Sequence, residues 1–262
     1  MSDPRPIGIF DSGIGGLAIA KQVRALMPNE DILYVADSFH APYGEKSEEY
    51  IIKRSFAVTD FLLSKNVKAI IVACNTATLA SIKRLRAHYD VPFIGVEPGV
   101  KPAALNTKTN VIGVLATSKT VTSEGFSSLA HHVADDIRVE VQACPDLVML
   151  VEQLKLSKQE CTAAIEKYVR PLLEKGADTL ILGCTHFSHL KLLIEKHVGP
   201  DIMVISTESA VAKEVKRRLE VNNMINPAIK PGKTHLFSNA AMSKFNLQVK
   251  QLWGNTDDIL PF

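Results

Sequence analysis

Short apolar runs alternate along this 262-residue chain with longer segments in which apolar residues recur every three or four positions. Apolar runs of about four to eight residues are typical of buried strands, and the three-to-four spacing is typical of amphipathic helices. We expect strands at 6–10, 31–36, 69–74 and 92–96, separated by helices at 16–27, 47–66 and 77–88. This alternation predicts a parallel sheet with helices on both faces.

A second series of the same kind begins after a break at Pro98, Gly99 and Pro102. Its expected strands are at 111–116, 137–143, 179–184 and 202–205, and its expected helices are at 121–129, 147–154, 158–175 and 190–197. A helix at 210–219, a strand at 234–237 and a last helix complete the chain. The sequence therefore predicts an α/β protein with two mainly parallel sheets.

The two series resemble each other. Residues 7–12 match residues 112–117 at an offset of 105, and the apolar runs that end in Cys74 and Cys184 match at an offset of 110. A shared strand composition accounts for either match alone. Two independent matches at nearly equal offsets favour two similar halves that face each other across a cleft, where small-molecule sites are common.

Charge and cysteine content exclude several classes of protein. Lys and Arg total 30 against 28 Asp and Glu, so the chain has no electrostatic footprint for nucleic acid or for an anionic membrane. No segment resembles a signal peptide, and no apolar run approaches the roughly 18 residues that span a bilayer. Four cysteines without a C-x-x-C pair predict neither a disulfide framework nor a zinc ribbon, and no histidines have metal-ligand spacing. We expect a cytoplasmic protein with reduced thiols and no metal.

Two cysteines stand out by their position. Cys74-Asn75-Thr76 and Cys184-Thr185-His186 each follow an expected strand, where open α/β sheets bind ligands. A helix that begins after each cysteine favours thiolate over thiol. One such cysteine alone is more often a packing residue, as we expect for Cys144 and Cys161. Two in equivalent positions indicate paired acid and base chemistry.

Other segments leave two interpretations open. The glycine-rich segment 11–16 lacks the spacing of a dinucleotide fingerprint, so it is either a structural turn or a turn whose N–H groups and Ser12 hold a carboxylate. The loop 41–44 is either a simple turn or a wall of the cleft. Glu152, among apolar neighbours, is either a surface residue or a site residue. No Arg or Lys falls inside these motifs, so a bound carboxylate would depend on amide and hydroxyl donors.

Together these segments resemble the motifs of glutamate racemases, of the cofactor-independent aspartate/glutamate racemase superfamily. The matching segments are Asp11-Ser12-Gly13-Ile14-Gly15-Gly16-Leu17, Pro42-Tyr43-Gly44, Cys74-Asn75-Thr76-Ala77, Glu97-Pro98-Gly99 and Gly183-Cys184-Thr185-His186. The resemblance covers nearly the whole chain, and the combination is far more specific than any single motif.

The resemblance implies a two-base racemisation of glutamate that needs no cofactor, metal or pyridoxal phosphate. One thiolate removes the α-proton, and the opposite thiol protonates the other face of the planar intermediate. Cys74 would act on D-glutamate with the help of Asp11, and Cys184 would act on L-glutamate with the help of Glu152 and His186. The implied substrate contacts are Asp11, Ser12, Tyr43, Gly44, Asn75, Thr76, Thr185 and His186.

The resemblance also implies a cytoplasmic homodimer that supplies D-glutamate for peptidoglycan, and hence for the cell wall and cell shape. We expect two α/β domains, residues 1–97 with 207–262 and residues 98–206, with the active site between them. The sequence departs from the family pattern at two places. Lys119 stands where a glycine is usual, which affects the loop around Thr120, and Met149 stands where a proline is usual, which affects the placement of Glu152.

Three alternatives remain open at this point. An aspartate racemase of the same superfamily shares both cysteines. A cysteine hydrolase would use one thiol with His186 and would leave the second cysteine motif without a role. A non-catalytic amino-acid-binding protein would need neither thiol for binding.

Overall fold

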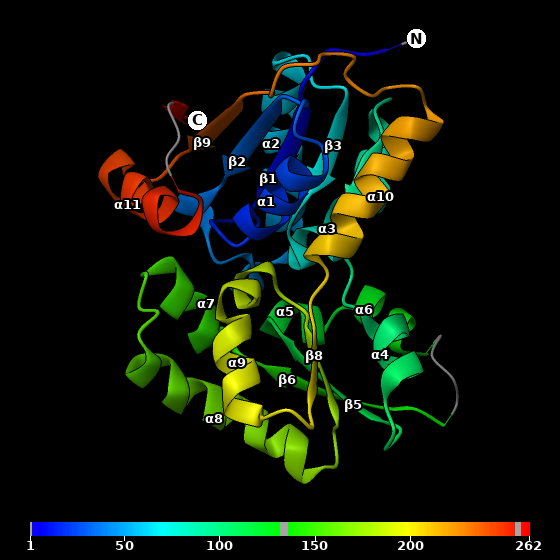
Figure 1. Cartoon of the computed structure of the whole chain (residues 1–262), viewed down its shortest axis with the longest axis vertical. Helices are drawn as coiled ribbons and strands as arrows, with labels where there is room; N and C mark the ends of the chain where they lie inside the picture. Colours follow the sequence, from blue (N-terminus) through cyan, green and yellow to red (C-terminus); the bar gives the residue numbers. More distant parts are fainter. Residues whose placement is uncertain (1, 132–135, 255–257) are drawn as a thin grey trace.

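The computed structural model describes residues 2–131, 136–254 and 258–262, which form two parallel sheets (Figure 1). The larger sheet has the spatial order β10 (Asp258–Pro261), β9 (Thr234–Ser238), β2 (Ile32–Ala36), β1 (Ile7–Asp11), β3 (Ala69–Val72) and β4 (Phe93–Gly95). The smaller sheet has the order β6 (Arg138–Ala143), β5 (Val111–Ala116), β7 (Thr179–Leu182) and β8 (Met203–Ile205). Every described strand pair is parallel, which confirms the predicted fold class.

The two sheets repeat one topology. The order β2-β1-β3-β4 in the larger sheet is reproduced as β6-β5-β7-β8 in the smaller one. The sequence similarity between residues 7–12 and 112–117 is therefore a similarity between β1 and β5, the central strands of the two repeats. The larger sheet adds β9 and β10 at the edge next to β2.

Helices cover both sheets. Those of the larger sheet are α1 (Leu17–Leu26), α2 (Glu48–Ser64), α3 (Asn75–His88), α10 (Glu208–Val221) and α11 (Met242–Leu252), with short 3₁₀ turns η1 (Ser38–His40) and η2 (Tyr43–Glu45). Those of the smaller sheet are α4 (Val100–Asn106), α5 (Ser118–Val121), α6 (Glu124–His131), α7 (Pro145–Glu152), α8 (Lys158–Glu174) and α9 (Lys191–Val198), with a 3₁₀ turn η3 (Thr185–Leu190). Serine side chains cap the two longest helices, since Ser47 Oγ accepts from Tyr50 N–H and Ser157 Oγ from Glu160 N–H.

Alternate residues of β1 pack into different layers, as the two-residue period of a strand requires. Ile7 and Ile9 pack in the core that contains α1 and α10, whereas Phe10 packs in the core that contains α2 and α3. The first of these cores continues into the other half of the protein, where it includes Val151 and Phe187. A continuous apolar core therefore holds the two halves together next to the site described below.

Strand β10 was not predicted from the sequence. It is a four-residue edge strand that contains Pro261, and neither its length nor its composition gives a strand pattern. It pairs in parallel with β9 at the edge of the larger sheet. Within the described residues, no helix is both long enough and apolar enough to cross a membrane.

Candidate active site

The candidate residues gather where the carboxyl ends of the two sheets meet. Asp11 ends β1, Cys74 lies two residues after β3, and Cys184 lies two residues after β7. The structure buries all of the candidate site residues, namely Asp11, Ser12, Tyr43, Gly44, Cys74, Asn75, Thr76, Glu152, Cys184, Thr185 and His186. The surface interpretation of Glu152 is therefore wrong, and Met149 in the same helix does not displace its side chain from the site.

The glycine-rich turn 11–16 brings the two halves into contact. The N–H of Ile14 donates to Glu152 Oε1 at 3.1 Å. A Cβ atom on Gly13 would lie 2.0 Å from that same oxygen, and one on Gly15 would lie 2.5 Å from His186 Nδ1. The turn therefore needs glycine for close approach, and it does hold a carboxylate, which belongs to the protein's own Glu152.

Cys184 lies beside a buried histidine–carboxylate pair. His186 Nδ1 is 3.7 Å from Cys184 Sγ, and His186 Nε2 is 2.8 Å from Glu152 Oε1. Burial alone would lower the pKa of His186, but its hydrogen bonds to Cys184 and Glu152 outweigh burial and raise it well above its usual value. Burial likewise opposes the charged form of Glu152, yet the hydrogen bond from His186 lowers its pKa. A protonated His186 stabilises negative charge on the Cys184 sulfur.

Cys74 has a different environment. It caps α3, where its sulfur accepts from Ala77 N–H at 3.4 Å, and its thiol donates to Ser12 Oγ at 3.7 Å. Burial and the nearby Asp11 charge nevertheless raise the pKa of Cys74 to about 12. The sequence-based expectation that a helix N-terminus lowers this pKa is wrong, because the desolvation of the thiolate exceeds the effect of one N–H donor. After Cys184 the chain forms the 3₁₀ turn η3, and the expected helix begins only at Lys191 as α9, so its N-terminus does not lie at this thiol.

Asp11 bridges the two cysteine motifs. Its carboxylate accepts from Gly13 N–H at 2.7 Å and from Thr185 Oγ1 at 2.8 Å, and Ser12 Oγ lies 3.4 Å away. Burial is the largest influence on its pKa and raises it. Asp11 thus couples to Cys74 through charge, while its hydrogen bond across the boundary goes to the residue after Cys184.

The loop that carries Tyr43 and Gly44 is a wall of the site. Tyr43 donates its hydroxyl proton to Asp37 Oδ2 at 2.5 Å, and Arg54 donates to both oxygens of Asp37 at 2.9 and 2.7 Å. A Cβ atom on Gly44 would lie 2.7 Å from the Cβ of Thr117, in the other half. The anchored loop therefore packs directly against the smaller sheet's side of the site.

Hydroxyl groups from both halves form a cluster. Thr76 Oγ1 lies 2.9 Å from Thr117 Oγ1, which donates to Thr120 Oγ1 at 3.0 Å. Asn75 Nδ2 donates to Val96 O, while its buried Oδ1 has no hydrogen-bond partner among the described residues. Sequence reasoning did not select Thr117 or Thr120 as site residues. The offset of 105 was the available signal, because it aligns Thr117 with Ser12.

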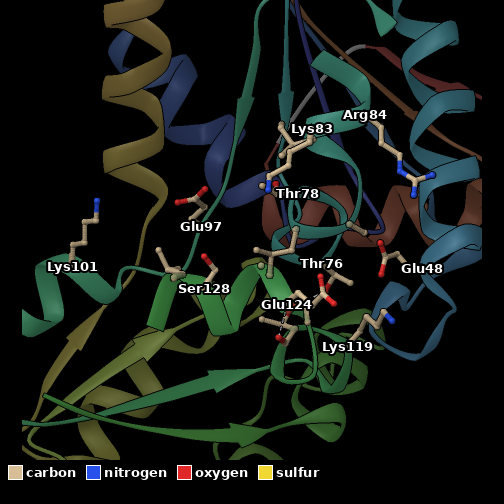
Figure 2. A pocket seen from close by; sticks show the side chains of 17 residues that line it. Glu48, Thr76, Thr78, Lys83, Arg84, Glu97, Lys101, Lys119, Glu124 and Ser128 are labelled. Atoms are coloured by element: carbon tan, nitrogen blue, oxygen red, sulfur yellow. Dashed lines mark hydrogen bonds between the residues drawn. The ribbon is translucent and has the colours of Figure 1, made fainter. Parts of the chain in front are cut away.

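A cavity of about 600 Å³ opens beside this hydroxyl cluster (Figure 2). Its lining includes Thr76 and Thr120 together with charged side chains such as Lys119 and Glu124, but neither Cys74 nor Cys184. Figure 2 shows Lys119 and Glu48 at one end of this pocket and Lys101 at the other. The cavity is therefore adjacent to the candidate reacting groups and does not contain them.

The remaining cysteines play the packing role expected of them. Cys144 and Cys161 are buried, and their thiols donate to the backbone oxygens of Gln142 and Lys155 at 3.2 and 3.3 Å.

The chain is similar to known amino-acid racemases in both sequence and structure. The Asp/Glu/Hydantoin racemase family matches residues 17–215. A glutamate racemase from Methylococcus capsulatus is 44% identical over 256 residues, which cover 98% of this chain and 94% of that protein. The crystal structure of a glutamate racemase isoform from Bacillus anthracis has a TM-score of 0.89 and 32% identity, over 97% of this chain and 96% of that one. Escherichia coli glutamate racemase in complex with L-glutamate and an activator has a TM-score of 0.87 and 29% identity, over 99% and 98% of the two chains. The chain therefore belongs to the Asp/Glu/Hydantoin racemase family.

Proposed function

We propose that this protein interconverts L- and D-glutamate with two opposed thiols, Cys74 and Cys184, as the acid–base groups. The observation that carries the proposal is that the two cysteine motifs meet at one buried centre with different partners, His186 with Glu152 beside one and Ser12 with Asp11 beside the other. Two-base racemisation needs one thiolate and one thiol at the same time. The difference between the two environments supports that requirement.

Glutamate is the proposed substrate because relatives over most of the chain are glutamate racemases. Eight of them are 40–47% identical to this chain. A Francisella tularensis relative at 31% identity was solved with D-glutamate and the Escherichia coli relative with L-glutamate. An aspartate racemase from Picrophilus torridus shares only the fold, at 18% identity and a TM-score of 0.58. These relationships favour glutamate over aspartate.

In the proposed reaction, Cys184 as thiolate removes the α-proton of L-glutamate. The positive charge on His186 stabilises that thiolate, and Glu152 stabilises the charge on His186. Cys74, whose raised pKa keeps it a thiol, donates a proton to the opposite face and yields D-glutamate. The reverse reaction exchanges the two roles, and Asp11, which Cys74 reaches through the Ser12 hydroxyl, then accepts the Cys74 proton so that the thiolate can act on D-glutamate.

The substrate carboxylates would be bound by uncharged donors. The candidates are the hydroxyls of Ser12, Thr76, Thr185 and, from the cluster described above, Thr117 and Thr120. The Oδ1 of Asn75, which has no partner in the part of the chain that the structure describes, is an acceptor suited to the α-ammonium group. Tyr43 and Gly44 would shape the wall, since the Tyr43 hydroxyl is already bonded to Asp37.

The family relationship also suggests where the protein acts, how it assembles and how its chain divides into domains. We infer a cytoplasmic homodimer whose D-glutamate enters peptidoglycan, and a domain division at 97/98 and 206/207 that places Cys74 in one domain and Cys184 in the other. Sedimentation of the purified protein tests the oligomeric state.

One experiment separates the proposed function from its alternatives. Purified protein without added cofactor is incubated with each enantiomer of glutamate and of aspartate, and circular dichroism follows the approach to a racemate. We expect racemisation of glutamate and little of aspartate. In Cys74→Ser and Cys184→Ser, kcat should fall by about 10²–10⁴-fold, the usual contribution of an acid–base group. The matched control Cys161→Ser should keep its activity. Turnover of aspartate in place of glutamate, or full turnover in either cysteine variant, would overturn the proposal.

A further inference from the structure

A side chain on α11, a helix of the larger sheet, holds the carboxylate of Glu152, which belongs to a helix of the smaller sheet. Gln248 lies on α11, which comes after β9 of the larger sheet, and its side chain is fully buried. Its Nε2 donates to the backbone oxygen of Glu152 at 2.8 Å and to Glu152 Oε2 at 3.3 Å. Figure 1 shows α11 next to α7 at the boundary between the two halves.

The two oxygens of Glu152 have separate partners. Oε1 faces His186 Nε2 at 2.8 Å and Ile14 N at 3.1 Å, whereas Oε2 accepts from Gln248. A carboxylate is planar, so a donor that fixes Oε2 also fixes the direction in which Oε1 faces the imidazole. Lys244, one turn earlier on α11, is a further influence that lowers the pKa of Glu152.

The orientation of the Gln248 amide is determined by these contacts. With Nε2 toward Glu152, the buried Oε1 of Gln248 has no partner among the described residues. The reversed amide would place that oxygen against the backbone oxygen and the carboxylate of Glu152, both of which are acceptors. The observed orientation therefore makes two hydrogen bonds to Glu152 and leaves the Gln248 Oε1 without a partner among the described residues.

We propose that Gln248 is a positioning residue for the Cys184 half of the reaction, in which it orients Glu152 and Glu152 holds His186 against the Cys184 thiol. The inference rests on the proposed function. It assigns to α11 a role in holding the histidine–carboxylate pair beside one thiol and not beside the other.

A kinetic isotope effect distinguishes this role from a general loss of structure. Enantiomers have equal free energy, so any variant must lower kcat/KM for both by the same factor. Gln248→Met, which keeps the length but removes the donor, should lower both by about 10-fold to 100-fold, the range for one hydrogen bond to a charged group. Because proton transfer at Cys184 becomes slower, the substrate isotope effect should rise with α-deuterated L-glutamate and fall with α-deuterated D-glutamate. Gln251→Met, at an exposed position of the same helix, is the matched control.

A second variant tests the donor directly. In Gln248→Glu the introduced carboxyl donates only when protonated, so activity relative to the wild type should recover as the pH falls. The groups that face Glu152 are His186 from η3, Lys244 from α11, and Asp11 and Tyr34 from the larger sheet, and all are kept in this variant. If the wild-type protein turns over glutamate, two results would overturn the inference. One is that Gln248→Met leaves the isotope effects unchanged, and the other is that Gln248→Glu shows no recovery of activity at low pH. Absence of glutamate turnover in the wild type would instead overturn the proposed function.

Discussion

His186 and Glu152 form a buried pair in which His186 Nε2 lies 2.8 Å from Glu152 Oε1. The hydrogen bond between them raises the pKa of His186 and lowers the pKa of Glu152, so it favours the charged form of both side chains. The pair joins η3 to α7 and lies against the glycine-rich turn after β1. We therefore expect its charge state to affect both the stability of the fold and the proposed chemistry of Cys184.

The pair should give the protein a defined pH dependence of stability. The pKa of His186 is raised from 6.5, so its contribution is complete below pH 6.5 and is lost as the pH rises through the folded value. The pKa of Glu152 is lowered from 4.5, so its contribution is complete above pH 4.5 and is lost as the pH falls through the folded value. Urea unfolding of the wild type and of the double variant His186→Asn/Glu152→Gln tests this. The difference in unfolding free energy should favour the wild type most between these two pH values, and a difference that does not vary with pH would refute it.

Cys74 should react slowly with alkylating agents at neutral pH. Its pKa is raised to about 12 by burial and by Asp11, and the thiolate is the reactive form. Labelling of Cys74 by iodoacetamide, measured by peptide mass spectrometry, should therefore increase about tenfold per pH unit through the mildly alkaline range. Asp11→Asn removes a neighbouring charge and should move this rise to lower pH. A wild-type labelling rate that reaches a plateau near about pH 9, the ordinary thiol range, would contradict the assignment.

Gly13→Ala should disturb both stability and activity. The new Cβ would lie 2.0 Å from Glu152 Oε1, so the carboxylate or the turn must move. We expect a loss of about 1–3 kcal/mol in the free energy of unfolding, as for other overpacked sites, together with reduced kcat. Gly125→Ala on α6 is the control, because its Cβ meets only the side chain of Leu79 at 3.0 Å. Equal behaviour of the two variants would show that the turn tolerates a side chain.

Arg54→Met should destabilise the protein by about 3 kcal/mol, at the low end for removing one partner of a buried ion pair. Asp37 is fully buried, but Arg54 is 21% exposed, so solvent partly screens the pair and the loss should be near the low end of that range. The same change should lower activity, because Asp37 anchors Tyr43 in the wall of the site. Arg217→Met breaks the exposed pair with Glu214 and should change stability by less than about 1 kcal/mol. Thermal unfolding of both variants provides the comparison, and similar losses would contradict this account of Asp37.

Much of the fold was predictable because most of the expected strands are short apolar runs with clear limits. The repeat that related residues 7–12 to residues 112–117 indicated two similar halves, and the shared strand order of the two sheets confirms that similarity. The order itself is seen only in the structure. Strand β10 could not be predicted, since its pairing depends on the edge of β9 and not on its own composition.

The site was predictable at the residues that carry motifs and unpredictable where contacts cross between the halves. The cysteine and glycine motifs are the segments that the structure brings together at the buried centre. The pKa of Cys74 could not be inferred, because the helix N-terminus is visible in sequence and the depth of burial is not. Gln248 has no motif at all, and only the docking of α11 reveals its contact with Glu152.

The most direct test of the two-thiol account is racemisation of each glutamate enantiomer in D₂O, stopped at low conversion. Two opposed bases remove the proton from one face and add a solvent-derived deuteron to the other. The account predicts a product that is fully deuterated at the α-carbon and a remaining substrate that is largely protiated, for both starting enantiomers. A product that keeps the substrate's own α-proton would mean that a single base serves both faces, and would contradict the assignment of Cys74 and Cys184.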